Sequence, residues 1–145
     1  MKLHVNLGEN SYDIVIEKGL LKKASEEIRE VYSGKRIAVI SDDSVYRIYG
    51  GELLNQLKST WECSTVILPH GETSKSINVL PGVYAKLLES GLSRSDLIVA
   101  LGGCVIGDLA GFVAATYLRG VPFIQIPTSL LAQVDSSVGG KVAVD

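Results

Sequence analysis

Apolar and polar residues alternate singly at the start of the chain, and continuous apolar runs replace this pattern further on. The alternation covers residues 2–7 and 12–17 on either side of Gly8–Ser11, which predicts a β-hairpin. Strand-length apolar runs follow at 37–40, 63–68, 97–101 and 122–126.

Helical spacing of apolar residues separates these runs. It predicts a first helix over Leu20–Val31 and a second helix whose apolar face begins at Val45, Ile48 and Tyr49. Two further helices are predicted over 80–88 and 106–118. A hairpin followed by alternating helices and strands is typical of an α/β domain. We therefore predict a Rossmann-like, doubly wound, mostly parallel sheet with an N-terminal β-hairpin.

Polar residues and glycines follow the predicted strands. Ligands of open parallel sheets bind at the carboxyl ends of the strands, and a crevice at that edge is the default binding site. We expect this edge to gather Asp42, Glu72, Gly102, Gly103, Thr128 and Ser129.

The Gly102-Gly103 pair stands between a predicted strand and a predicted helix. Adjacent glycines allow positive φ and close approach of the backbone to a ligand, and a helix start offers free N–H groups to a phosphate. The Gly-Gly-x-x-x-Gly pattern does not match the dinucleotide fingerprint G-x-G-x-x-G, and glycine pairs also simply close turns. A pyrophosphate site and a purely structural turn both remain open.

Acidic residues at two other loops have alternative interpretations. Asp42 or Asp43 could accept hydrogen bonds from a ribose, but Asp is also a preferred helix N-cap, and the two roles are compatible. Glu72 and Lys75 could reach a nucleotide, although their spacing alone favours a solvated loop.

The segment from Asp135 to Lys141 contains a Gly-Lys pair but does not form a P-loop. A P-loop has glycine where this chain has Asp135 and Ser or Thr where it has Val142. The close grouping of Asp, Ser and Lys still predicts recognition of phosphate or hydroxyl groups.

Composition narrows the classes of partner. The 145 residues are 46% hydrophobic with a net charge of -2, which suits one domain with its own core. Charges of both signs are interspersed, which argues against nucleic acid and membrane partners. Cys63 and Cys104 do not form a metal-binding spacing, so we expect reduced thiols in a cytoplasmic protein.

Two long runs resemble the 3-dehydroquinate synthase family, NAD- and divalent-metal-dependent enzymes of the shikimate pathway. They are GGCVIGDLAGFVAATYLRG at 102–120 and PTSLLAQVDSSVGGK at 127–141. The resemblance extends back through SDDSV at 41–45 and PHGETSKS at 69–76. It implies that residues 1–145 are the family's N-terminal, NAD-binding domain.

The resemblance also implies roles for individual residues. Asp135 and Lys141 match positions that contact the polyhydroxylated substrate, and Arg119 matches an arginine that reaches the substrate phosphate from the other subunit of a homodimer. The implied NAD contacts are Asp42, Ser44, Glu72, Lys75, Gly102, Gly103, Val105, Asp108, Thr128, Ser129, Leu131 and Lys141.

The implied reaction converts 3-deoxy-arabino-heptulosonate 7-phosphate, a phosphorylated sugar acid, to 3-dehydroquinate with elimination of phosphate. The family's C-terminal α-helical domain, which binds zinc or cobalt, would lie beyond Asp145, so we expect this chain alone to be inactive. Cys104 stands where the family usually has a third glycine, and threonine is commoner at the positions of Ser129 and Val142. We expect the Cys104 side chain to crowd the pyrophosphate turn.

Related enzymes and one noncatalytic role are the alternatives. A related sugar phosphate cyclase or a glycerol-dehydrogenase-like enzyme would share the fold and the NAD site, but Arg119, Asp135 and Lys141 favour a phosphorylated acid over glycerol. A noncatalytic NAD-binding module is the alternative from a different class.

Overall fold

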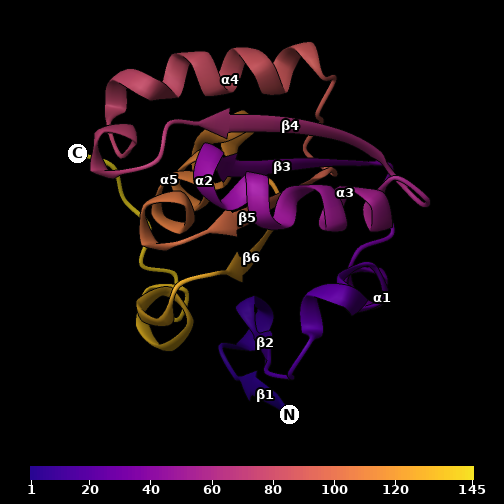
Figure 1. Cartoon of the computed structure of the whole chain (residues 1–145). Coiled ribbons are helices and arrows are strands. Elements are labelled where there is room, and N and C mark those ends of the chain that lie inside the picture. The colour runs from indigo at the N-terminus through magenta and orange to yellow at the C-terminus, as the bar shows by residue number, and fades with distance from the viewer.

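The computed structural model describes residues 1–145, and a four-stranded parallel sheet forms its centre (Figure 1). The strands lie in the order β4-β3-β5-β6. Their bounds are β3 (Arg36–Asp42), β4 (Glu62–Leu68), β5 (Leu97–Gly102) and β6 (Phe123–Pro127). The predicted α/β class and parallel sheet are confirmed.

Helices connect the strands. The α-helices are α1 (Ala24–Val31), α2 (Asp43–Val45), α3 (Gly51–Leu57), α4 (Leu80–Glu89) and α5 (Cys104–Thr116). Short 3-10 or π-helical turns add Gly8–Asn10, Leu20–Lys23, Tyr46–Gly50, Glu72–Ser74, Ile77–Val79, Tyr117–Arg119 and Ala132–Ser136. None of the helices has the length and apolar character needed to span a bilayer.

The central strands β3 and β5 are buried on both faces, which explains why they are continuous apolar runs. Ile37 and Val39 point to one face, where they join an apolar cluster with α1 and α3. Ala38 and Ile40 point to the other face and join a cluster with α4 and α5. Helices therefore cover both faces, as expected for a doubly wound sheet.

The strand order places a topological switch point between β3 and β5. From β3 the chain moves to β4 on one side, and it then returns to β5 on the other side of β3. Ser41 is fully buried there, and its hydroxyl donates to the carbonyl oxygen of Leu101 at 2.6 Å. Because ligands of such sheets bind at the switch point, the loops after β3 and β5 frame the expected crevice.

The predicted hairpin is present but shorter and separate from the main sheet. Strands β1 (Lys2–Val5) and β2 (Tyr12–Val15) form an antiparallel two-stranded sheet (Figure 1). Lys2 Nζ lies 3.2 Å from Glu30 Oε2, and the Gly139 N–H donates to the Tyr12 hydroxyl at 3.0 Å. These polar contacts link the hairpin to the rest of the domain.

Four apolar residues expected on buried helical faces are exposed: Val31, Ile48, Leu88 and Leu118. Val31 is the last residue of α1, and Ile48 lies in a π-helical turn that shifts the helical phase. The buried stripe of α4 is narrower than predicted and leaves Leu88 outside it. Leu118 leaves the helical conformation altogether, with φ at 49°.

Candidate functional site

The carboxyl ends of the parallel strands meet at one edge of the sheet, beside α2 and the start of α5 (Figure 1). Asp42 ends β3, the loop that contains Glu72 and Lys75 follows β4, and Gly102 ends β5. Thr128 follows β6 and donates its backbone N–H to the Gly102 carbonyl at 2.9 Å. The polar loops predicted to gather are therefore at one edge, although their contacts with a ligand stay predictions.

The start of α5 supplies hydrogen-bond donors to this edge. Gly103 is the N-cap residue, and the Gly107 N–H donates to its carbonyl at 3.0 Å. The amides of Cys104, Val105 and Ile106 precede any helical carbonyl that could accept from them. Free amides at a helix N-terminus suit a phosphate group.

Gly102 and Gly103 do not use positive φ, contrary to the sequence-based expectation. They are needed for space instead. A Cβ on Gly102 would lie 2.6 Å from Ile106 Cβ, and one on Gly103 would lie 3.3 Å from Ser129 Oγ. Gly102 therefore lets α5 pack on β5, whereas Gly103 lets the backbone at the start of α5 lie close to Ser129.

An ion pair joins two more of the predicted residues. Lys75 Nζ lies 2.9 Å from Asp108 Oδ2, and the two side chains are only 23% and 16% exposed. The hydrogen bond to Asp108 raises the pKa of Lys75 above its ordinary value. The pair connects the loop after β4 to α5 at this edge of the sheet.

The two aspartates after β3 have different environments. Asp42 is 9% exposed, and its Oδ1 accepts the Val45 N–H at 2.9 Å, so the capping interpretation is confirmed. Asp43 is exposed, and its Oδ1 accepts the His70 N–H at 3.0 Å and lies 2.7 Å from His70 Nδ1. This hydrogen bond with His70 lowers the pKa of Asp43. Ser44, half-buried, follows in α2.

His70 is a residue that the sequence reasoning did not assign to the site. Its pairing with Asp43 connects the loops after β3 and β4, which are far apart in sequence. The available signal was its position two residues after a predicted strand, at the edge where ligands bind.

The remaining predicted residues lie in exposed segments. Lys141 Nζ pairs with Asp135 Oδ1 at 2.6 Å, and Leu131 is exposed just before the Ala132–Ser136 turn. Arg119 is exposed, has a positive φ of 68° and makes no ion pair. It follows α5 and so lies roughly 20 Å, the length of that helix, from the Gly103 turn. The structure does not bring Arg119 to the crevice of its own chain.

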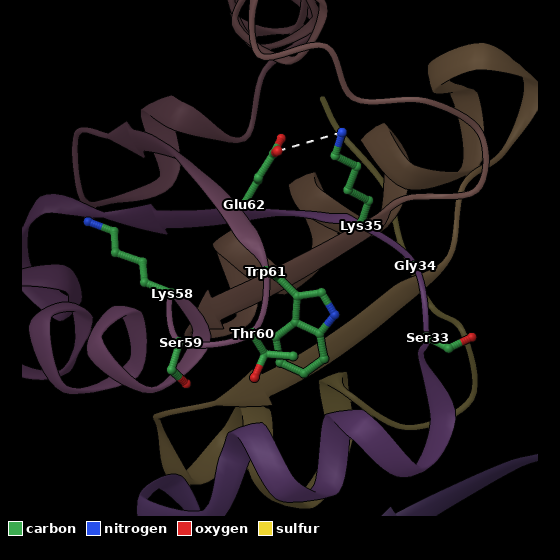
Figure 2. Close-up of a pocket in the computed structure, with 8 residues that line it drawn as sticks. All are labelled: Ser33, Gly34, Lys35, Lys58, Ser59, Thr60, Trp61 and Glu62. Atoms are coloured by element: carbon green, nitrogen blue, oxygen red, sulfur yellow. Dashed lines mark ion pairs between the residues drawn. The ribbon is translucent and has the colours of Figure 1, made fainter.

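A polar hollow of about 760 Å³ lies at the opposite edge of the sheet, where β3 and β4 begin (Figure 2). It is wide open to solvent, and Lys35 Nζ lies 3.6 Å from Glu62 Oε1 at its rim. Its lining residues are Ser33, Gly34, Lys35, Lys58, Ser59, Thr60, Trp61 and Glu62. The hollow shares no residue with the predicted site, and the strand order gives it no ligand-binding role.

Side chains that could hold a metal ion are not grouped in this chain. No cluster of three or more His, Cys, Asp or Glu residues has suitable positions. The residues present therefore do not fit a metal centre.

Comparison with known proteins agrees with the geometry. Residues 65–145 match the family model for the 3-dehydroquinate synthase N-terminal region. The chain is 59% identical over 144 residues to the 3-dehydroquinate synthase of Clostridium perfringens (strain 13 / Type A), covering 99% of this chain and 41% of that protein. It is 53% identical over 145 residues to the enzyme of Clostridium botulinum (strain Alaska E43 / Type E3), again covering 99% and 41%.

A solved structure extends the comparison to three dimensions. It is 2-epi-5-epi-valiolone synthase from Streptomyces hygroscopicus subsp. jinggangensis 5008 with NAD⁺ and Zn²⁺ bound. The TM-score is 0.82 at 29% identity, covering 97% of this chain and 39% of that chain.

This chain spans about 41% of the length of the two curated 3-dehydroquinate synthases named above. Because the family model matches more than half of its residues, the chain belongs to the 3-dehydroquinate synthase family, in the part that forms the N-terminal region.

Proposed function

We propose that this chain forms the NAD-binding part of a 3-dehydroquinate synthase. The observation that carries the proposal is the start of α5, whose N-cap Gly103 and free first-turn amides follow β5 at the switch point of the sheet. The valiolone synthase, which has the same fold, binds NAD⁺. The identity of 53–59% to enzymes named 3-dehydroquinate synthase supports this particular activity.

The cofactor's pyrophosphate would lie at the start of α5. Gly102, Gly103 and Val105 would face it, because the free amides there favour negative charge. Asp42 and Ser44 would hold the adenosine ribose at the end of β3. The remaining proposed contacts are Glu72, Lys75, Asp108, Thr128, Ser129, Leu131 and Lys141.

The chain's own residues would orient the reactants and hold charge. When bound, NAD supplies reversible hydride transfer at a hydroxyl-bearing carbon of the substrate. In the proposal Lys141, which pairs with Asp135, donates hydrogen bonds to 3-deoxy-arabino-heptulosonate 7-phosphate. The product is 3-dehydroquinate, and phosphate is the leaving group, which makes the enzyme a lyase.

A homodimer forms the second part of the proposal. Arg119 is exposed and unpaired at the far end of α5, so in a second copy of the chain it could bind the substrate phosphate. The zinc or cobalt ion of the complete enzyme would be held by residues outside these 145. We place the protein in the cytoplasm, where the free thiols of Cys63 and Cys104 stay reduced.

A different sugar phosphate cyclase is the second candidate. The structural similarity to the valiolone synthase supports it, because that enzyme shares the fold of this chain and binds NAD⁺. The higher identity to 3-dehydroquinate synthases makes it the weaker candidate.

Calorimetric titration of the chain with NAD tests the cofactor site. Gly103→Val should weaken NAD binding by about tenfold or more, because the new side chain crowds Ser129 and the helix start where the pyrophosphate would lie. Gly82→Ala is the control, since nothing lies within 4 Å of its Cβ. Absence of NAD binding in the wild type, or equal binding in both variants, would contradict the proposal.

Activity needs a second experiment. The chain is fused to the remaining portion of the Clostridium perfringens relative and supplied with NAD and Zn²⁺ or Co²⁺. Phosphate release from 3-deoxy-arabino-heptulosonate 7-phosphate supports the synthase. NAD binding without phosphate release supports a noncatalytic NAD-binding module instead.

A further inference from the structure

The polar hollow where β3 and β4 begin contains a hydrogen-bond donor that no group of the protein uses (Figure 2). Trp61 lines the hollow and is only 6% exposed, and its indole N–H has no hydrogen-bond partner within the chain. Because no fully buried side-chain nitrogen or oxygen lacks a partner, this N–H has to reach the solvent of the hollow. The indole nitrogen only donates, so its partner there has to be an acceptor.

The indole ring is fixed before any ligand arrives. The rings of Trp61 and Tyr32 pack with their centroids 6.1 Å apart, and the Tyr32 hydroxyl donates to the Arg36 carbonyl at 2.7 Å. The backbone N–H of Trp61 donates to the Leu57 carbonyl at 2.9 Å. In Figure 2 the indole nitrogen lies on the side of the ring that faces the labelled Ser33. A donor held in this way loses little conformational freedom on binding.

Positive charge predominates around the hollow. Lys35 and Lys58 are among its lining residues, and Glu62 is the only carboxylate that lines it. Glu62 is already paired, with Lys35 Nζ at 3.6 Å and with Arg36 Nε at 3.2 Å. Lys58 takes part in none of the protein's ion pairs. A hollow with an excess of one sign of charge attracts ligands of the opposite sign, so this one favours an anion.

Hydroxyl groups add further donors to the lining. Thr60 Oγ1 accepts from Arg29 Nη2 at 2.6 Å, which leaves the Thr60 proton free to donate and holds another cation beside the hollow. The Ser33 hydroxyl has no hydrogen-bond partner within the protein, whereas Ser59 Oγ donates to the Gln56 carbonyl at 2.8 Å. Together with the indole N–H, these hydroxyls suit a ligand that has several acceptor oxygens.

We propose that this hollow is a binding site for a phosphate group, with the Trp61 indole N–H and the hydroxyls of Ser33 and Thr60 as donors. A doubly charged oxyanion matches cations that outnumber the single carboxylate better than a neutral ligand or a monocarboxylate does. The volume of about 760 Å³ accommodates a small phosphorylated molecule as well as free phosphate. The site lies at the edge of the sheet opposite the proposed NAD site and does not depend on it.

Fluorescence tests the site directly, because Trp61 is the only tryptophan of the chain. Sodium phosphate is titrated into the 145-residue chain without NAD, in exchange for sodium chloride, so that the ionic strength stays constant. The Trp61 emission should change saturably, with a Kd of about 1 mM. The indole N–H also gives one nuclear magnetic resonance signal, which should shift with the same Kd. If neither signal saturates, the hollow does not bind phosphate.

Two lysine variants locate the bound phosphate. Lys58→Gln should raise the Kd for phosphate by about threefold or more, because a cation that lines the hollow is lost. The matched control is Lys86→Gln, which removes an exposed lysine from α4 on the other face of the sheet and should keep the wild-type Kd. Equal Kd values in the two variants would overturn the proposal, because phosphate would then bind outside the hollow.

The indole N–H has its own variant. Trp61→Phe keeps an aromatic ring beside Tyr32 but removes the donor, so phosphate binding measured by calorimetry should weaken by about threefold or more. An unchanged Kd in this variant would remove the indole from the site.

Titrations with other ligands identify the source of the phosphate. Saturation at a lower concentration of glycerol 3-phosphate than of inorganic phosphate assigns the site to a phosphate ester, and the reverse order assigns it to free phosphate. Glycerol, which lacks the phosphate, should leave the Trp61 emission unchanged. If acetate saturates the signal as tightly as phosphate, the proposal is overturned, because the hollow would then bind any small anion.

Discussion

Asp42 is the residue for which two compatible roles were predicted, and the structure tests one of them. Its sequence context left helix capping and ribose binding open together, and the structure confirms the cap on Val45. The carboxylate is nearly buried, yet no buried side-chain polar atom in the protein lacks a partner. The second oxygen of Asp42 is therefore not both buried and unpaired. Ribose binding by this carboxylate stays a prediction.

Two substitutions of Asp42 separate the roles. Asp42→Ala should lower the free energy of unfolding by about 1 kcal/mol, because the cap is lost. Asp42→Asn should keep the cap, since Asn and Asp cap equally well, while NAD binding weakens through loss of charge. Urea unfolding and calorimetric NAD titration measure the two effects. Unchanged NAD affinity in Asp42→Asn would remove Asp42 from the cofactor site.

Asp96 is a buried carboxylate with a structural role at the opposite edge of the sheet. It is 2% exposed, and Oδ2 accepts from Ser93 N at 2.7 Å and Ser93 Oγ at 2.9 Å, while Oδ1 accepts from Arg36 N at 3.1 Å. Burial alone raises the pKa of Asp96, but these hydrogen bonds outweigh it and hold the pKa below the ordinary value of 3.8.

A depressed carboxyl pKa predicts the sign of a pH effect. The contribution of Asp96 to stability is fully present above the pKa of about 3.9 for an unfolded Asp, and it is lost as the pH falls through the lower folded-state pKa. Asp96→Asn should cost roughly 2 kcal/mol near pH 7, because two Ser93 donors lose a charged acceptor. The difference between wild type and variant, from urea unfolding, should shrink below about pH 4. A difference that stays constant to pH 2 would contradict this assignment.

Sequence reasoning at the residue scale found the loops of the site more reliably than the contacts within them. It placed Asp42, Glu72, Gly103 and Thr128 at one edge, because strand ends fix where loops emerge. It did not predict the Lys75–Asp108 pair, which depends on how far α5 lies from the loop after β4. Such distances come from packing rather than from spacing along the chain.

Helix α5 is the element on which both the site and the core depend. Its first residues lie at the carboxyl edge of the sheet, while Ile106, Leu109, Ala110 and Val113 pack in the core. Residues 141–145 cross it, and Asp145 exchanges backbone hydrogen bonds with Lys75 and Ile77 at 3.1 and 2.8 Å. A Cβ on Gly111 would lie 2.2 Å from Val142 Cγ1, so glycine permits this crossing.

Gly111→Ala should destabilise the fold, although alanine favours helices. Overpacking against Val142 costs about 1–3 kcal/mol, which exceeds the gain of roughly 1 kcal/mol in helix propensity. Gly82→Ala in α4, where nothing lies within 4 Å, should instead stabilise by up to about 1 kcal/mol. Adding Val142→Ala to Gly111→Ala should recover most of the loss in urea unfolding. Equal stabilisation by both glycine substitutions would show that residues 141–145 do not pack on α5.

The elements themselves were predictable where the apolar periodicity is long. Strands β3 to β6 and helices α4 and α5 lie where the sequence pattern places them, because a sheet buried on both faces requires continuous apolar runs. The stretch from Asp43 to Leu57 was harder. There α2 and α3 are joined by a π-helical turn, which has more residues per turn than an α-helix. A search for the 3.6-residue period of apolar positions cannot recognise such a turn.

At the scale of the whole molecule, sequence reasoning predicted the doubly wound sheet but not the isolation of the hairpin. Strands β1 and β2 pair only with each other, and their links to the domain include exposed polar contacts such as Lys2–Glu30. Leu3, Leu7 and Ile16 of this segment are exposed, whereas every residue of β5 is buried. A two-stranded hairpin contributes little stability by itself.

Native-state hydrogen exchange should therefore divide the molecule into two regions. Amides paired between β1 and β2 should open locally, with an opening free energy well below that of global unfolding, because few apolar contacts hold them. Amides of β3 and β5, which pair with each other in the centre of the sheet, should exchange only through global unfolding. Raising the urea concentration should accelerate exchange in β3 and β5 strongly and in the hairpin weakly, since local opening exposes little surface. Equal opening free energies in the hairpin and in β5 would show that the hairpin unfolds cooperatively with the sheet, so that its few links to the domain stabilise it more than their exposure implies.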